Sequence, residues 1–389
     1  MKTSAFVYPW DIVGDPAAPD RVAALGVRQA TLAAAYHSTR ALTPRHPRHR
    51  VVVAEHSAVL YPPGERWRGR ELRPHPAGDW APGDAYGEAA AALADAGLAV
   101  HSWVVLAHNS RLGAEHPGVC VVNAYGDRYP YAPCIAVPDI RAYLCDLAAE
   151  AAVRPGAAGT ELESLGWYGL AHLHAHDKTG GVPLGEAGQY LMSLCFCPTC
   201  REGYAGVGQD PDELAAAVRA ALEPLWRGAP PEDGWPAVEK LLGAARAAAT
   251  RAWRDGAARD LQRAAVAAVR AAAPDGFQIL LHADPAAYHC GANAGVDPAD
   301  VLAHADGVVV PCASGTALLR PFAPHAAPHT VVAANFTVVS GMGGSPATLA
   351  ADAARAADDG ANQLRLYHAG LASDADLDAV TAALGRLGG

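Results

Sequence analysis

The sequence predicts an α/β protein built as a (β/α)8 barrel. Short apolar runs alternate with Ala-rich stretches, and eight such strand–helix units fit a chain of 389 residues. The composition is 51% hydrophobic, which is enough for a large core. A doubly wound open sheet is the weaker alternative, because Pro9, Trp10 and Asp11 follow the first strand where such folds carry a Gly-rich phosphate loop.

The expected strands are apolar, β-branched runs that end at turn residues. In chain order, the eight barrel strands are predicted at 4–10, 27–34, 98–106, 158–163, 277–282, 307–312, 330–336 and 362–367, with an additional strand at 51–54.

The expected helices are rich in Ala, Leu, Arg and Glu, which favour helix formation. Asp297 and Ser345 each precede a proline, as an N-cap followed by Pro at the first helical position would. Helices are predicted at 84–96, 138–152, 211–226, 236–273, 297–305, 345–359 and 373–386.

Two insertions interrupt the alternation of what we expect to be a single catalytic barrel over residues 1–389. Residues 38–83 are rich in Pro, Arg and His and are predicted to form a loop or hairpin excursion. Residues 164–235 form the second insertion, a long helical segment after the fourth barrel strand that carries a cluster of cysteines.

The charge pattern excludes some partners. Only 18% of residues are charged and the net charge is −10, which disfavours nucleic acid because phosphate binding needs clustered Lys and Arg. No run approaches the roughly 20 apolar residues of a membrane span. The first residues show no apolar signal segment, so we expect a cytoplasmic protein; its Ala-rich helices could also mediate a homo-oligomer.

Three cysteines, Cys195, Cys197 and Cys200, lie within six residues. Their C-x-C-x₂-C spacing allows the three sulfurs to converge, and a structural zinc site needs a fourth ligand, for which Cys134 is the best candidate. In a cytosolic chain, close thiols indicate a metal before a disulfide. The sequence therefore predicts structural Zn²⁺; free cysteines packed as small apolar groups are the alternative.

Chemistry in this fold gathers at the C-terminal ends of the strands, where Glu161 and Glu163 end the fourth strand. Alternation places both on the same side, and their repulsion raises the pKa of the more buried one, as a general acid requires. We expect Glu163 to be the acid/base, with Glu161 as its orienting partner or as an acceptor for a sugar hydroxyl. The alternative is a structural carboxylate bonded to Arg141 or to a backbone amide.

A second carboxylate could come from the fifth strand, where Asp284 follows His282 on the same face. Asp284 would act as a nucleophile or as a base that activates water. The alternative is a helix N-cap before Pro285.

The remaining strand ends carry aromatic and polar side chains, which suit a carbohydrate better than a nucleotide. An aromatic can instead belong to the core, and Glu55 with His56 can form a loop ion pair. The predicted substrate-binding residues are Trp10, Asp11, His37, Glu55, His56, His108, Trp167, Tyr168, His282, Asn335, Tyr367 and His368.

His172, His174 and His176, followed by Asp177, form a separate run. Imidazole is a common zinc ligand, so this run is the basis of an alternative hypothesis with a catalytic metal. Substrate contact and solvated loop histidines are the other interpretations.

The cysteines and Glu163 resemble a pattern of the zinc-containing β-galactosidase family of glycoside hydrolases, over roughly residues 98–205. Cys134 stands shortly before a Pro-x-x-Arg helix start at 138–141, Glu163 closes the fourth strand, and C-x-C-x₂-C follows. The resemblance implies a structural zinc held by Cys134, Cys195, Cys197 and Cys200, and a catalytic Glu163.

The chain departs from that family at two positions. Leu162 stands where the family has Asn before its acid/base, and the seventh strand around Asn335 lacks the family's nucleophile Glu. The stretch 159–163 also looks like the fourth-strand motif of chitinase-like barrels, which use a substrate acetamido group instead of a protein nucleophile. The chain most resembles the loosely defined hypothetical glycosyl-hydrolase-like TIM barrels.

Together these features predict a glycoside hydrolase that acts on an oligosaccharide or a glycosylated small molecule by carboxylate acid/base catalysis. One alternative is a metal-dependent barrel lyase, isomerase or hydrolase that uses a histidine cluster. The other is a barrel that binds sugar without turnover.

Overall fold

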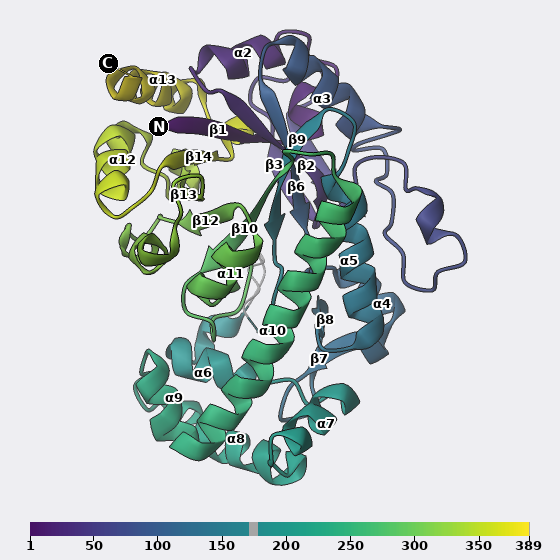
Figure 1. The fold of residues 1–389 in the computed structure, drawn as a ribbon, viewed down its shortest axis with the longest axis vertical. Helices are drawn as coiled ribbons and strands as arrows, with labels where there is room; N and C mark the ends of the chain where they lie inside the picture. Colours follow the sequence, from purple (N-terminus) through teal and green to yellow (C-terminus); the bar gives the residue numbers. More distant parts are fainter. Residues whose placement is uncertain (171–177, 389) are drawn as a thin grey trace.

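The chain folds as a closed barrel of eight parallel strands, in a computed structural model that describes residues 1–170 and 178–388. The first strand pairs with both the second and the last, which closes the ring and confirms the (β/α)8 prediction (Figure 1). The barrel strands, in chain order and in the order around the ring, are β1 (Lys2–Val7), β2 (Gln29–Tyr36), β6 (Ala99–Val105), β9 (Ala157–Glu163), β10 (Gln278–Asp284), β12 (Gly307–Pro311), β13 (Val331–Thr337) and β14 (Gln363–Tyr367).

Helices surround this ring, and α5 and α10 pack against each other along one side of it (Figure 1). None of the helices that the structure describes is long and apolar enough to cross a membrane. The α-helices are α1 (Pro9–Ile12), α2 (Ala18–Ala24), α3 (Ala85–Asp95), α4 (Ser110–Glu115), α5 (Pro138–Ala152), α6 (Gly185–Met192), α7 (Pro198–Gly206), α8 (Pro211–Trp226), α9 (Trp235–Leu242), α10 (Ala244–Ala272), α11 (Pro298–His304), α12 (Leu349–Asp358) and α13 (Asp374–Gly388).

Two predicted boundaries are wrong. The first strand ends at Val7 and not at Trp10, because Pro9 begins α1 and Asp11 accepts a hydrogen bond from the Tyr8 backbone N–H at 2.8 Å. The helix predicted over 236–273 is broken at Gly243, whose φ of 85° and ψ of 137° are strained for any other residue.

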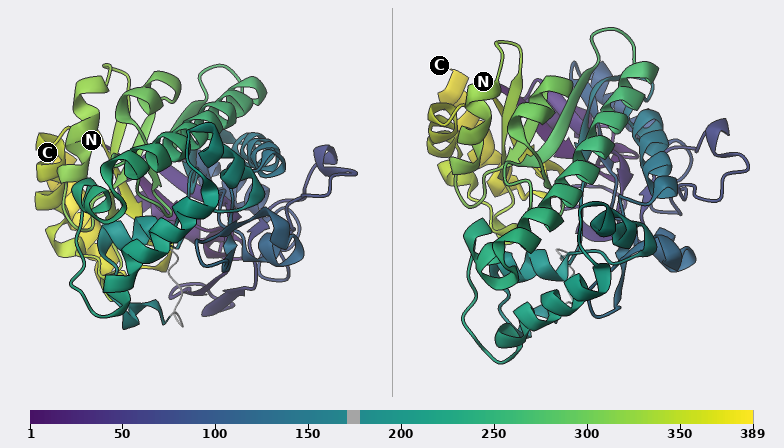
Figure 2. Two further views of the ribbon diagram at one scale, coloured as in Figure 1. Left: turned by 90° about the horizontal axis from the view of Figure 1, so that it is seen from below. Right: turned by 60° about the horizontal axis from the view of Figure 1, so that its bottom comes forward.

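The insertion after β9 contains α6, α7, α8 and α9 and lies below the barrel in Figure 1. Viewed from below, it covers part of the barrel end (Figure 2). The long helix α10 then returns the chain from the insertion to the barrel wall, where β10 begins (Figure 1). The insertion therefore faces the strand ends at which the catalytic side chains are expected.

Smaller strands decorate the barrel. In the segment 38–83, β3 (Thr39–Leu42) and β4 (Val51–Ala54) form an antiparallel hairpin, so the additional strand predicted at 51–54 exists but lies outside the ring. The other short strands are β5 (Ala58–Val59) against β2, the hairpin of β7 (Cys120–Val122) and β8 (Arg128–Pro133), and β11 (Ala294–Gly295) against β10.

Candidate active site

Glu163, the last residue of β9, lies inside the barrel near its C-terminal end and is only 4% exposed. The indole N–H of Trp103, from the neighbouring strand β6, donates a hydrogen bond of 2.7 Å to its Oε2. Burial raises the pKa of Glu163 above its ordinary value of 4.5, against the opposing effects of His282 and Trp103. In the part of the chain that the structure describes, no lysine or arginine forms an ion pair with it.

Glu161 lies two residues earlier, deeper in the barrel, in a different electrostatic environment. Its Oε1 accepts a hydrogen bond from Nε of Arg365 on β14 at 2.6 Å and one from the Thr31 hydroxyl at 3.2 Å. Burial alone would raise the pKa of Glu161, but Arg365 and His282 lower it to about 2. Glu161 is therefore an ionised group in a buried ion pair. Its Oε2 has no hydrogen-bond partner among the described residues, and its predicted role as an acceptor for a sugar hydroxyl stays a prediction.

The cation that pairs with Glu161 is Arg365, and not Arg141, which lies on α5 outside the ring. Sequence reasoning missed Arg365, although a signal was present. A charged residue in the middle of an otherwise apolar barrel strand needs a buried partner of opposite charge.

His282, from β10, lies between the two carboxylates. Its Nε2 is 3.4 Å from Oε2 of Glu161, and its Nδ1 is 3.8 Å from Oε2 of Glu163. The ring is 2% exposed. This geometry favours a positioning role for His282, toward Glu163, more than the predicted role in substrate binding.

Aromatic side chains from the first, second and last strands gather around Glu163. The hydroxyl of Tyr8 donates to that of Tyr36 at 2.9 Å and lies 3.0 Å from Nδ1 of His368, and the Tyr8 ring stacks on Trp10 with centroids 4.6 Å apart. His368 has a left-handed φ of 60°, an unusual conformation at the end of β14 that holds the ring against Tyr8. Burial lowers the pKa of His368 to about 3 and keeps it neutral.

Tyr367 precedes His368 and belongs to the same group, since its ring contacts Phe6 and Trp103 edge-on. Burial raises the pKa values of Tyr8, Tyr36 and Tyr367 well above the ordinary value, so these hydroxyls stay protonated. The structure thus brings the predicted residues Trp10, Tyr367 and His368 together beside Glu163. Sequence reasoning did not assign Tyr8 to the site.

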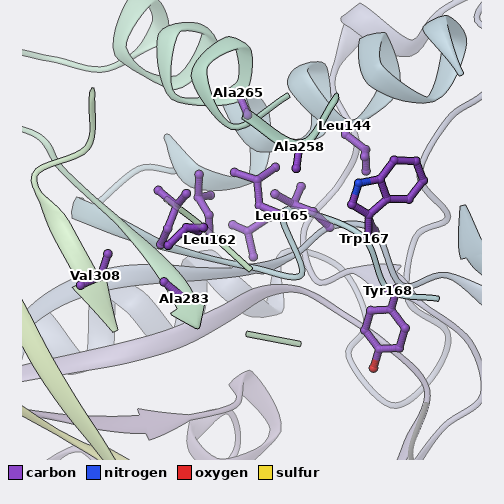
Figure 3. Close-up of a cluster of buried hydrophobic side chains, with 14 of the residues drawn as sticks. Leu144, Leu162, Leu165, Trp167, Tyr168, Ala258, Ala265, Ala283 and Val308 are labelled. Carbon is purple, nitrogen blue, oxygen red and sulfur yellow. The ribbon is translucent and has the colours of Figure 1, made fainter. Parts of the chain in front are cut away.

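Trp167 and Tyr168 are neighbours in sequence but extend toward opposite sides (Figure 3). Trp167 is directed into the core, where its indole N–H donates to the Arg254 carbonyl at 2.9 Å, and this position does not favour the predicted contact with substrate. The Tyr168 ring stacks on His108 with centroids 4.3 Å apart, and His37 lies 4.9 Å beyond His108.

Asp284, the last residue of β10, lines a cavity of about 740 Å³ between the barrel end and the insertion. Its Oδ1 accepts a hydrogen bond from the Ala286 N–H at 2.8 Å, and its Oδ2 lies 2.9 Å from Nδ1 of His289. The first contact closes a turn and does not cap a helix, because no helix begins at Pro285. Tyr168 also lines this cavity.

Three predicted binding residues lie away from Glu163. Asp11 caps α1 beside Arg45 on the outer side of β1, where burial raises its pKa to about 7. Glu55 is exposed, and His56 contacts Arg111 at 2.8 Å next to Trp80. Their predicted contact with substrate is not supported, because each follows a strand end but turns away from the barrel interior.

Asn335 stands on β13 at the level of Arg365 on the neighbouring strand, and its amide Oδ1 has no hydrogen-bond partner among the described residues. The run of His172, His174 and His176 lies outside the described residues. Among those that are described, the only group of three or more His, Cys, Asp or Glu with metal-ligand spacing consists of cysteines.

That group contains Cys134, Cys195, Cys197 and Cys200, all buried, with ligand atoms within 4.8 Å of one another. Sγ of Cys134 is 3.6 Å from that of Cys200 and 3.7 Å from that of Cys197. Four sulfurs at tetrahedral zinc bond lengths of about 2.3 Å lie about 3.8 Å apart, so this spacing fits such an ion. The predicted convergence of the four thiols is confirmed.

The barrel is similar to the solved structures of several glycoside hydrolases. The chain superimposes on α-L-fucosidase isoenzyme 2 from Paenibacillus thiaminolyticus with a TM-score of 0.58 at 12% identity, over 100% of this chain and 49% of that one. It matches the PgaB (BpsB) glycoside hydrolase domain from Bordetella bronchiseptica with a TM-score of 0.54 at 16% identity, over 98% and 97%.

A third similar structure is a catalytic mutant of Gan42B, a GH42 β-galactosidase from G. stearothermophilus, with a TM-score of 0.55 at 13% identity over 99% of this chain and 56% of that one. The chain thus spans about half the length of the fucosidase and the galactosidase. Neither a protein family nor a curated protein matches the chain. At these identities the likeness establishes the shared fold.

Proposed function

We propose that the protein is a glycoside hydrolase in which Glu163 donates the proton to the leaving oxygen. The observation that carries this proposal is a buried carboxyl at the end of the fourth barrel strand, which accepts a hydrogen bond from the Trp103 indole and has no Lys or Arg partner among the described residues. The glycoside hydrolases that share the fold support a carbohydrate substrate. The surrounding rings of Tyr8, Tyr36 and Tyr367 support the same substrate class.

In this proposal the two glutamates of β9 have different roles: Glu163 carries the proton, and Glu161 carries a fixed negative charge. Arg365 keeps Glu161 ionised, and the fixed negative charge of Glu161 helps to raise the pKa of Glu163. A carboxyl with a raised pKa retains its proton closer to neutral pH, which a general acid must do before it can donate. His282 lies between the two groups, with one ring nitrogen within 4 Å of each carboxylate.

Asp284 is the proposed second carboxylate, either as the nucleophile or as the base that activates water. It lines the cavity at the end of the neighbouring strand, and His289 fixes one of its oxygens. No acidic residue on β13 competes for this role, because Asn335 occupies the position near the end of that strand. The separation of the two carboxyl groups in a substrate complex distinguishes retention, at about 5 Å, from inversion, at about 6.5–9.5 Å.

We also propose that Cys134, Cys195, Cys197 and Cys200 hold a structural zinc ion. Cys134 follows β8, Cys195 and Cys197 precede α7 in the insertion, and Cys200 lies in the first turn of α7. When bound, the ion would join these two segments and complete the ligand set of four thiolates, which leaves no position open for catalysis. Its contribution is to the placement of the insertion over the barrel end.

A barrel that binds sugar without turnover is the second candidate, and one observation favours it. The amide of Asn335 replaces a carboxylate on β13, and both oxygens of Asp284 already have protein partners. The two candidates differ in whether product forms.

The test compares wild type with Glu163→Gln on a panel of aryl glycosides and oligosaccharides, with Glu88→Gln, an exposed substitution on α3, as the control. Loss of the proton donor should lower the rate by about 10²–10⁴-fold, while the control keeps its rate. Full activity of Glu163→Gln on any glycoside that wild type cleaves contradicts the proposal. Calorimetric binding of a sugar without product, across the panel, favours the second candidate.

A further inference from the structure

The cavity between the barrel end and the insertion differs in chemistry from the surroundings of Glu163. Its described walls come from Tyr168 and Leu170 after β9, from the stretch 179–190 that leads into α6, and from the end of β10 and the segment after it. A volume of about 740 Å³ is within the range of about 300–1,000 Å³ that drug-sized ligands occupy in proteins. The cavity therefore has room for a group larger than the single sugar that Glu163 would act on.

Much of the lining is apolar. Leu170, Val182 and Leu184 contribute aliphatic side chains from the insertion side, and Pro311 contributes one from the end of β12. The ring of Tyr288 packs edge-on against Tyr190 and is held by a hydrogen bond of 2.9 Å from its hydroxyl to Glu186. Thr179, Gln189 and Asn293 add polar groups to the lining, but the greater part of it is apolar, which suits a ring system with few polar atoms better than a pyranose.

The charges of the lining exclude an anionic ligand. Among the described residues that form the walls there is no Lys or Arg, and two carboxylates, Asp284 and Glu186, lie at one end. His289 bridges them, with Nδ1 2.9 Å from Asp284 and Nε2 3.5 Å from Glu186. A phosphate or carboxylate on the ligand would meet like charges here. Asp284 and Glu186 already accept hydrogen bonds from backbone N–H groups, and Glu186 also accepts one from Tyr288, so a neutral ligand fits better than a cation.

The cavity shares Asp284, the proposed second carboxylate, with the proposed catalytic site. Asp284 ends the strand that carries His282, and Tyr168, which also lines the cavity, lies in the segment that follows Glu163. Tyr168 also stacks on His108, which joins the cavity wall to the aromatic side chains at the barrel end. A sugar at Glu163 would therefore direct its leaving group into this space.

We propose that this cavity is the leaving-group subsite and that the substrates are glycosides with a neutral, apolar, ring-shaped aglycone, such as an aryl group. The inference rests on the proposed function for the identity of the reaction. It does not rest on that function for the binding itself, because a free aglycone should bind to the cavity without any sugar attached.

The experiment is a fluorescence titration of the full-length protein with 2-naphthol at pH 7. We expect saturable binding at one site, unchanged in Glu163→Gln and weakened at least about tenfold in Val182→Asp, which places a charge in the apolar wall. Val53→Asp is the matched control, because the same substitution there lies on the exposed side of β4 and should bind like wild type. Val182→Thr, of nearly the same shape, should bind more weakly than wild type and covers the case in which Val182→Asp does not fold.

The outcomes separate this inference from the proposed function. Wild-type binding of 2-naphthol by folded Val182→Asp and Val182→Thr, or no saturable binding by wild type, overturns the assignment of the cavity even if Glu163 catalyses glycoside cleavage. Binding that depends on Val182, together with aryl glycoside cleavage that survives Glu163→Gln, supports the cavity and contradicts the role of Glu163. Faster cleavage of aryl glycosides than of oligosaccharides, lost in Val182→Asp, supports both.

Discussion

Two glutamates on one strand, Glu161 and Glu163, acquire opposite properties from neighbours that are distant in sequence. Strand alternation predicts that both face the barrel interior, and they do. Alternation does not say which cation meets which carboxylate, and Arg365 lies 204 residues from Glu161 along the chain. The shared face could therefore be predicted, while the ion pair that separates their pKa values could not.

Arg365→Met should destabilise the protein strongly, because it leaves the charge of Glu161 buried without a partner. Both side chains of this pair are 0% exposed, and breaking such a pair costs about 3–5 kcal/mol. Urea unfolding measures the loss. Arg355→Met on α12 is the control, since Arg355 is 62% exposed in its pair with Asp352 and should cost at most about 1 kcal/mol. Equal losses in the two variants would show that Arg365 contributes no more than a surface ion pair.

At the scale of elements, the regular alternation of strands and helices could be predicted, and the breaks between them could not. The sequence 236–273 is rich in residues that favour helix on both sides of Gly243, so the break there is weakly marked. The direction of the Trp167 side chain could not be predicted from the sequence either, because it depends on how α10 packs over the segment after β9. Glycine is the only local signal at the break, and Gly256 within α10 shows that the signal is ambiguous.

These two glycines give a paired prediction. Gly243→Ala should lower the stability by about 1–3 kcal/mol, because its φ of 85° is strained for a residue with a Cβ. Gly256→Ala should raise it by about 0.5–1 kcal/mol, because this position is helical and a Cβ there meets no other atom within 4 Å. Thermal unfolding distinguishes the two, and a shift in the same direction for both would contradict the break between α9 and α10.

The cysteine cluster connects two elements, and its removal should loosen one from the other. We expect about one zinc per chain in wild type, and loss of the metal with faster proteolysis of the insertion in Cys200→Ser. Cys145→Ser, on α5 outside the cluster, is the control and should keep the metal. Metal analysis and limited proteolysis provide the measurements. A wild-type protein without zinc, or a Cys200→Ser variant as resistant as wild type, would contradict the proposed structural ion.

At the scale of the whole molecule, the barrel places side chains from most of its strands around one interior. This arrangement explains which site residues could be predicted from the sequence and which could not. Residues on the inward face of a strand, such as Glu163, His282 and Tyr367, could be predicted from alternation and lie together. Residues beyond a strand end, such as Asp11 and His56, could not, because loop geometry sets their direction.

The cavity was also beyond sequence reasoning. It forms where the insertion approaches the segment after β10, and these walls are about a hundred residues apart along the chain, as in the pair of Glu186 and Tyr288. Apolar residues such as Val182 and Leu184 carry no local sign that they face a cavity and not a core. Their role depends on the fold as a whole.

The most direct test of the account is a pH titration of the Glu163 carboxyl by ¹³C NMR, with the signal assigned by its absence in Glu163→Gln. Burial raises the pKa of this group, so the midpoint should lie above 4.5. By linkage, its contribution to stability is then fully present below pH 4.5 and is lost as the pH rises through the folded-state midpoint. A midpoint at or below 4.5 would contradict the raised pKa and remove the difference from Glu161 on which the proposed proton donor depends.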